Sequence, residues 1–282
     1  QTAGTQVNLD FSDAADLARK LCLSQRLSAV AYALFANSPL LEGKPSGFLS
    51  TRGEIWSRTD SDRCGLIDAL LSPSAGLDDF VAYALDVPLY FIDRNQQYID
   101  MTASRFTFRQ FLESGWNGER ATLRDWNLHL STLFPEVRLR PQIEVRSADS
   151  LPPRFTPAVA ALYKGLLYSE EALQGAEALL MSLSREEFVG LYHRSWRDGF
   201  ATRCSGGTLG EIIAELLKLA QASLQEQFGA GYSGADESHF LDPLQELVAD
   251  QQTLAERLLK RWPATRAEQL QLLIEHCGYR AK

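Results

Sequence analysis

The sequence predicts an α+β fold in which strands and loops come first and helices follow. Up to about residue 150, short segments of alternating polarity are separated by stretches rich in Gly, Pro and Ser. After that point, apolar residues recur at helical spacing in one segment after another. We therefore expect one domain portion over residues 1–282, with a strand-and-loop core at 1–150 and a helical part at 151–282.

The first part begins with a predicted strand and a long predicted helix. Apolar and polar residues alternate over Thr5–Phe11, which favours a strand with one buried face. Ser12 and Asp13 offer N-caps to a helix over residues 14–36, and Pro39 ends it. Residues 40–74 are rich in Gly, Pro, Ser, Asp and Arg and lack periodic apolar runs. We expect a long functional loop there.

The remaining elements follow from the same patterns. Before the double proline at 152–153 we expect helices at 77–84, 108–112 and 123–133, strands at 137–140 and 143–146, and a hairpin of strands 87–93 and 97–101 around the turn at 94–96. After it, helices are predicted at 157–168, 170–183, 185–196, 209–228, 243–262 and 264–277.

Composition excludes several classes of partner. The net charge is −8, and Lys and Arg are dispersed without the basic stripe of a nucleic-acid-binding protein. No stretch approaches the roughly 18 unbroken apolar residues of a membrane helix, and no secretory leader is visible. The four cysteines show no CxxC pair and are interpreted as reduced thiols, so we expect a cytoplasmic location. They are Cys22, Cys64, Cys204 and Cys277.

Glu144 and Arg146 form the sharpest candidate pair. They are two residues apart in a predicted strand, so their side chains project from one face. A carboxylate and a guanidinium side by side can hold Mg²⁺ and a phosphate oxygen. The alternative is an exposed face of cross-strand salt bridges.

Two other groups of polar residues are candidates for binding. Arg52 and Trp56 lie in a charged segment that continues to Arg63, and an Arg can grip both oxygens of a carboxylate. A solvated loop held by a buried Trp is the alternative. Gln6 and Asn8 share one face of the first strand, where amides could contact a metal or a nucleotide or simply face solvent. The four histidines show no zinc spacing, and no P-loop is present.

Together these segments resemble the plant-type glutamate–cysteine ligases, which also occur in bacteria. The resemblance runs in the family order from the start of the chain to about residue 168 and continues more weakly through WRDGF to about Trp262. The matching stretches are TQVNLDFSDAADLARK, ALFANSPLLEGKPSGFLSTRGEIW, TDSDRCG, YALDVPLYF, TFRQFL, LFPEVRLRPQIEVRSAD and GLLY.

The resemblance implies a glutamine-synthetase-like ligase fold, in which an antiparallel sheet forms a funnel with helices outside. It implies that ATP, with Mg²⁺, phosphorylates the γ-carboxylate of glutamate, and that the amine of cysteine then attacks the acyl phosphate. Small molecules are the implied partners. By this resemblance Glu144 and Gln6 are metal ligands, Arg146 faces the transferred phosphate, and Asn8 contacts ATP. Four residues are implied to contact substrate: Arg52, Trp56, Arg63 and Tyr83.

Several departures from the family pattern keep alternatives open. Family members carry an N-terminal half before the QVNLD strand, so the chain, which does not begin with Met, is expected to be a C-terminal portion. Met101 and Pro157 stand where plant members have cysteines, which argues against their thiol switch. Pro153 replaces a Trp, so another glutamate–amine ligase is an alternative. A non-catalytic homologue that acts as a binding subunit is another.

Overall fold

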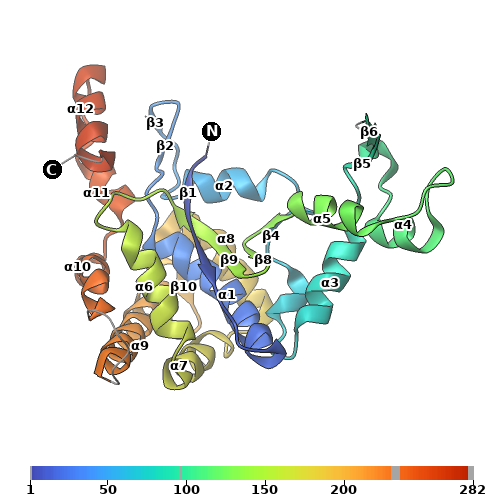
Figure 1. The fold of residues 1–282 in the computed structure, drawn as a ribbon. Coiled ribbons are helices and arrows are strands. Elements are labelled where there is room, and N and C mark those ends of the chain that lie inside the picture. The colour runs from blue at the N-terminus through green and yellow to red at the C-terminus, as the bar shows by residue number, and fades with distance from the viewer. Residues whose placement is uncertain (1, 96, 230–235, 279–282) are drawn as a thin grey trace.

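A three-stranded antiparallel sheet lies at the centre of the computed structural model, which describes residues 2–95, 97–229 and 236–278 (Figure 1). Its strands are β1 (Gly4–Leu9), β9 (Ile143–Asp149) and β8 (Val137–Leu139), in the order β1-β9-β8. The predicted strands are confirmed within a few residues, and the mixture of strands and helices confirms the α+β class.

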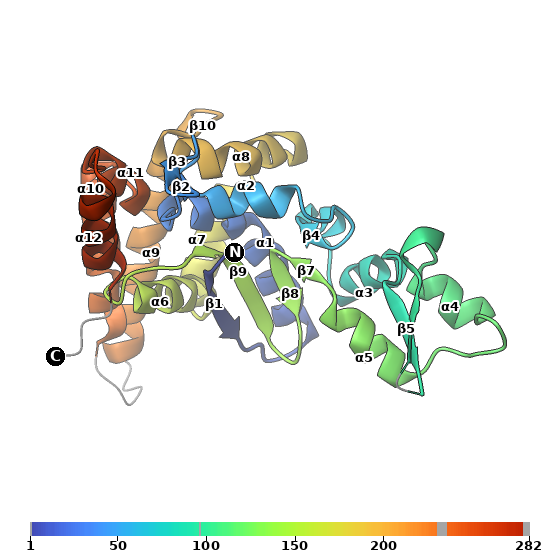
Figure 2. The ribbon, with the colours of Figure 1, turned by 90° about the horizontal axis from the view of Figure 1, so that it is seen from above.

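Helix α1 (Ala14–Leu34) covers one face of the sheet (Figure 2). Of the two predicted N-caps, Asp13 is the one used: its side chain accepts hydrogen bonds from first-turn N–H groups. Val145 is buried in the same core as α1, and it pairs in register with Val7 on one side and Val137 on the other. Because side chains alternate along strands, the neighbours of these valines lie on the opposite face.

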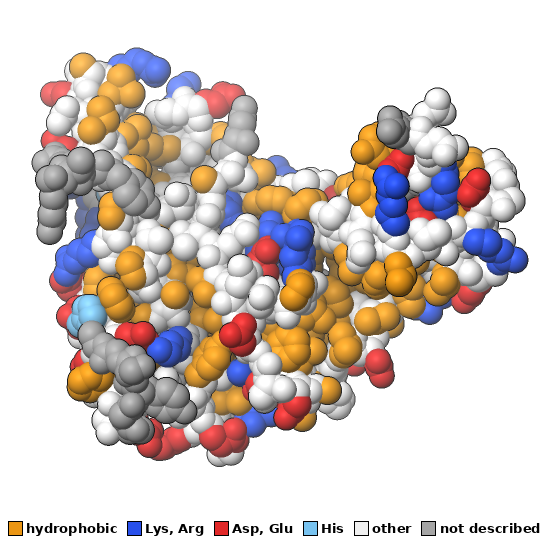
Figure 3. Space-filling view, in the orientation of Figure 1, with side chains coloured by type: hydrophobic (Ala, Val, Ile, Leu, Met, Phe, Trp, Pro, Cys, Tyr) orange, Lys and Arg blue, Asp and Glu red, His pale blue; other side chains and the backbone are white. Residues whose placement is uncertain are grey.

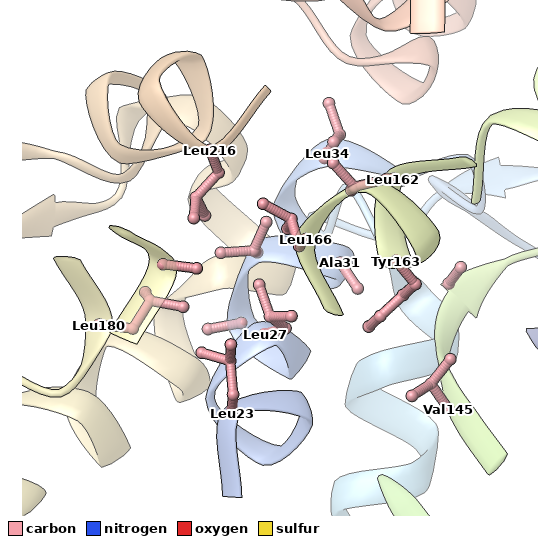
Figure 4. Packing of buried hydrophobic residues seen from close by; sticks show 14 of the residues in the cluster. Leu23, Leu27, Ala31, Leu34, Val145, Leu162, Tyr163, Leu166, Leu180 and Leu216 are labelled. Atoms are coloured by element: carbon pink, nitrogen blue, oxygen red, sulfur yellow. The ribbon is translucent and has the colours of Figure 1, made fainter. Parts of the chain in front are cut away.

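Four helices of the second half pack around α1 and complete the main core. They are α6 (Thr156–Leu167), α7 (Glu170–Leu180), α8 (Arg185–Asp198) and α9 (Leu209–Gly229). Figure 4 shows Leu27 of α1 among leucines of α6, α7 and α9. Helices α6 and α9 approach closely at Gly165, where an added Cβ would lie 2.6 Å from the Ala220 carbonyl oxygen. These helices form an outer layer of the main core.

The end of the chain differs from the prediction of one helix over residues 243–262. The structure has two helices there, α10 (Asp242–Asp250) and α11 (Leu254–Lys260), followed by α12 (Arg266–Cys277). Gln251 adopts a left-handed conformation with φ of 49°, which ends α10. Thr253 and Glu256 then form a capping box that starts α11, so a local cap overrides the apolar periodicity.

Residues 77–131 form an arm that projects from the main body (Figures 1 and 2). The arm has its own small core, which includes Ile92, Phe108 and Phe111. The predicted hairpin is present, although its first strand starts later than expected and Gln96 of its turn lies outside the described residues. The arm contains α3 (Leu77–Asp86), β5 (Phe91–Arg94), β6 (Gln97–Asp100), α4 (Phe108–Ser114) and α5 (Leu123–Ser131).

The segment predicted as a long loop, residues 40–74, is instead largely ordered into short elements. Helix α2 (Thr51–Ser57) is capped by Ser50, whose hydroxyl accepts the N–H of Gly53. The segment also contains β2 (Leu40–Leu41), β3 (Lys44–Pro45), β4 (Cys64–Gly65) and the 3₁₀ helix η1 (Asp68–Leu71). The loop prediction was wrong because α2 is short and depends on packing against α8.

The remaining elements are short connections. They are the 3₁₀ helices η2 (Thr102–Ser104), η3 (Gly199–Ala201) and η4 (Glu237–Leu241) and the strands β7 (Phe134–Pro135), β10 (Arg203–Cys204) and β11 (Gly207–Thr208). All four cysteines are free. In the described parts of the chain, helices long enough to span a membrane are not apolar enough to do so.

Candidate functional site

The face of the sheet opposite α1 carries an ion triad centred on Glu144. Asn8, Glu144 and Arg138 are register partners across the three strands, so their side chains share this face. The Glu144 carboxylate accepts hydrogen bonds from Arg138 at 3.0 Å and from Arg146 at 2.6 Å. Figure 3 shows basic side chains beside an acidic one over this part of the sheet. Glu144 and Arg146 therefore share a face, as predicted.

The triad is buried rather than exposed. The exposed fraction is 7% for Glu144, 8% for Arg138 and 7% for Arg146. Burial by itself raises the pKa of Glu144, but the hydrogen bonds and charges of the two arginines outweigh it and hold the pKa below its ordinary value. The salt-bridge alternative from the sequence is thus present, although not as a solvated surface feature. Glu144 is a carboxylate at neutral pH, with guanidinium groups on both sides.

A β-bulge in β9 sets the position of Arg146. Thr5 pairs with Ala148 and Val7 with Val145, so Arg146 and Ser147 together lie opposite Gln6. Gln6 and Asn8 are both exposed. The structure therefore places the two predicted amide side chains on the strand next to the triad, with Gln6 opposite the bulge.

Arg52 is on α2, and its side chain is hydrogen-bonded to the two bulge residues of β9. Its two terminal nitrogens donate to the main-chain carbonyls of Arg146 at 2.5 Å and Ser147 at 3.3 Å. Only 5% of Arg52 is exposed, and an added Cβ at Gly4 would lie 2.7 Å from its Nε. This close approach explains a glycine at the start of β1. The geometry favours a structural contribution from Arg52 that the resemblance does not imply.

Trp56 lies one helical turn after Arg52 and forms an aromatic wall beside Arg146. The Arg146 guanidinium is 5.9 Å from the Trp56 ring and 5.5 Å from the ring of Phe134, distances at which cation–π attraction operates. Among the described residues, the buried indole Nε1 of Trp56 has no hydrogen-bond partner. Trp56, Phe134, Arg146 and Arg52 line a small pocket of about 10 Å³.

Arg63 and Tyr83 belong to a second cluster next to the first. Arg63 donates to Asp60 at 3.1 Å and lies 3.4 Å above the Tyr90 ring. Burial, with the nearby Cys64 thiol, raises the pKa of Tyr83. Strand β4, which starts at Cys64, pairs with β7 and so brings this cluster toward the Trp56 pocket. Arg63 and Tyr83 thus lie near each other in this second cluster, and neither lines the Trp56 pocket.

The comparisons identify the family. The sequence profile of glutamate-cysteine ligase family 2 (GCS2) matches residues 1–276. The chain belongs to glutamate-cysteine ligase family 2. It is similar to the chloroplastic glutamate–cysteine ligases of Brassica juncea, at 42% identity over 265 residues, and of Medicago truncatula, at 41% identity over 263 residues. These matches cover 93% and 92% of this chain but 50% of each relative.

The chain spans about half the length of the curated relatives it matches, such as the Arabidopsis thaliana enzyme, of which 49% is covered.

The comparisons also correct the expected location. The relatives are named chloroplastic, which contradicts the cytoplasmic location expected from the cysteine pattern. Spaced reduced thiols are compatible with more than one compartment, so the cysteine pattern could not decide the location.

Sequence reasoning missed two residues of this GCS2 site, Arg138 and Glu136. Arg138 lies in a predicted strand, where alternation shows which residues share its face. The sequence does not show that Glu144 of the next strand is its hydrogen-bond partner. Glu136 is buried and accepts hydrogen bonds from the hydroxyls of Tyr32 at 2.9 Å and Tyr192 at 2.5 Å. No sequence signal linked those tyrosines to Glu136, because they come from α1 and α8.

Magnesium is the metal that the family resemblance implies, and the donor set bears on it directly. No group of three or more His, Cys, Asp or Glu side chains that could hold a metal occurs in residues 2–95, 97–229 and 236–278. Glu144 offers one carboxylate, and Mg²⁺ at phosphate-transfer sites usually takes one or two carboxylates plus phosphate oxygens and water. A single carboxylate of this kind fits a magnesium ion whose other ligands are phosphate oxygens and water.

Other features of the chain do not add to the site. At Gly206-Gly207, before α9, the Glu211 side chain already accepts the Thr208 N–H, so an acidic group occupies the helix start. Cavities of about 450 and 630 Å³ are lined by none of the eight predicted site residues, whereas a third, of about 350 Å³, is lined by Asn8 together with Lys164 and Tyr168. The sheet face and the Trp56 pocket remain the candidate site.

Proposed function

We propose that this chain is part of an ATP-dependent glutamate–cysteine ligase. The observation that carries the proposal is the Arg138–Glu144–Arg146 triad beside Trp56, in a chain of this family. Two guanidinium groups around one carboxylate leave a net positive charge on the sheet face, which favours a polyphosphate. The relatives are named for joining glutamate and cysteine. The funnel-shaped ligase fold and the C-terminal position of this chain are part of the same proposal.

In the proposed reaction, a γ-carboxylate oxygen of glutamate attacks the terminal phosphorus of ATP, and ADP leaves. The amine of cysteine then attacks the acyl carbon, phosphate leaves with the bonding electron pair, and the amine gives up a proton. Arg146 is proposed to face the transferred phosphate and to stabilise the charge that develops on it. Mg²⁺ supplies further charge neutralisation when it is bound, with Glu144 and Gln6 as the proposed protein ligands.

The other proposed roles rest on placement around the triad. Asn8 is proposed to contact ATP from β1, because it is exposed beside Glu144. Trp56 is proposed to contact an amino-acid substrate, which its unpartnered indole N–H supports. Substrate contacts are also proposed for Arg52, Arg63 and Tyr83. Arg52 and Arg63 already make hydrogen bonds within the protein, so a substrate would have to bind the remaining N–H groups of their guanidinium groups.

A phosphate-release assay tests the proposal. The protein that contains this chain should release phosphate only when ATP, Mg²⁺, glutamate and cysteine are all present. Arg146→Ala should remove this activity, whereas Arg140→Ala, which removes an exposed arginine from the same hairpin, should leave it intact. No phosphate release with all substrates present would refute the ligase assignment. Faster release with another amine than with cysteine would favour the alternative acceptor.

A further inference from the structure

Glu136 is a buried carboxylate held by three hydroxyl groups from separate parts of the chain. Its Oε1 accepts from Tyr32 and Tyr192, and its Oε2 accepts from Ser147 at 2.6 Å. The residue is 5% exposed. Burial, together with the Glu136 charge, raises the pKa of both tyrosines well above its ordinary value, so both remain protonated donors. The carboxylate is therefore fixed in place by α1 and α8.

The same residue grips the bulge that carries Arg146. The main-chain carbonyl of Glu136 accepts the Arg146 N–H at 3.1 Å, and its side chain accepts the Ser147 hydroxyl. Arg52 also donates to the main-chain carbonyls of the same two bulge residues. The two bulge residues have no regular partner on β1, so without these contacts this part of β9 would be free to shift.

We propose that Glu136 is a positioning residue for Arg146, acting through Ser147 and the β9 bulge. The inference rests on the proposed function, in which Arg146 faces the transferred phosphate. A group that stabilises a phosphate must be held within about 0.5 Å of its productive position by the residues behind it. Glu136 ties the bulge to two helices of the main core, and so transmits the rigidity of that core to the Arg146 side chain.

The test removes the Ser147 hydroxyl, which is a small change that keeps the charge of Glu136. Ser147→Ala should lower kcat by about tenfold to a hundredfold, the cost of a misplaced catalytic group. The KM values for ATP, glutamate and cysteine should stay within about twofold, because no substrate contact is removed. Ser147→Thr keeps the hydroxyl and should restore kcat. Ser223→Ala, which truncates a buried serine on α9, is the matched control and should leave kcat unchanged.

Amide hydrogen exchange in this chain gives a second readout that does not need ligase activity. The Arg146 N–H should exchange about tenfold faster in Ser147→Ala than in the wild type, a loss of about 1.4 kcal/mol of local protection. Amides of α9 should be unaffected. A wild-type kcat in Ser147→Ala, or a loss that Ser223→Ala reproduces, would overturn the inference. If the wild-type protein shows no ligase activity, the proposed function fails. An unchanged exchange rate of the Arg146 N–H in Ser147→Ala would separately refute the positioning role of Glu136.

Discussion

Replacing Glu144 with Gln tests the triad directly, because this change removes one charge and almost no volume. Arg138 and Arg146 would then remain buried beside a neutral amide. Leaving buried charges without their partner costs about 3–5 kcal/mol. Gln still offers one oxygen to the guanidinium groups, so we expect the lower end, about 3 kcal/mol. This is about a hundredfold change in the unfolding equilibrium.

The loss should depend on pH in a defined direction. The folded-state pKa of Glu144 is lowered from its ordinary value of 4.5, so the carboxylate stabilises the folded protein fully above that pH. This contribution is lost as the pH falls through the lowered folded-state pKa. The difference in free energy of unfolding between wild type and Glu144→Gln should therefore be complete at pH 7, begin to shrink below about pH 4.5 and be smallest in stronger acid.

Urea unfolding followed by far-ultraviolet circular dichroism, at pH 7 and at pH 3, measures these differences. Glu246→Gln is the matched control, because Glu246 forms an exposed ion pair with Arg154 and should cost no more than about 1 kcal/mol. A Glu144→Gln protein as stable as this control at pH 7 would refute the buried-triad argument, as would a deficit that is equally large at pH 3. In the proposed ligase the same variant should also lose phosphate release.

Two further substitutions test other parts of the structure. Arg52→Lys keeps the charge but loses the planar fork. If Arg52 holds the bulge, kcat should fall with each KM unchanged, whereas if it binds a substrate carboxylate, the KM for glutamate or cysteine alone should rise about tenfold to a hundredfold. Steady-state kinetics with each substrate varied in turn distinguishes the two. Gly165→Ala would press a methyl group onto the Ala220 backbone and should lower the free energy of unfolding by about 1–3 kcal/mol. Gly175→Ala meets only a flexible leucine side chain on the same neighbouring helix and should cost less; equal losses in urea unfolding would contradict the packing argument.

Local signals predicted the elements that carry their own start, stop and periodicity. The first strand and α1 were predicted because alternation and the Asp13 cap are properties of adjacent residues. Helix α2 was missed because its seven residues include Gly53, a poor helix former. Gly53 is required by packing, since an added Cβ would lie 2.8 Å from the Tyr32 ring.

The sequence by itself determined the α+β class, the shared face of Glu144 and Arg146, and the resemblance to the family that the profile confirms. Strand alternation and motif order are properties of residues that follow one another along the chain, so they are visible in the sequence. Only the tertiary structure decided that Glu144 is shared by two arginines and that Glu136 is held by Tyr32 and Tyr192. Those tyrosines are 104 and 56 residues away in sequence, and no local pattern encodes such pairs. They meet because α1 and α8 pack against the sheet, and that packing depends on the whole core.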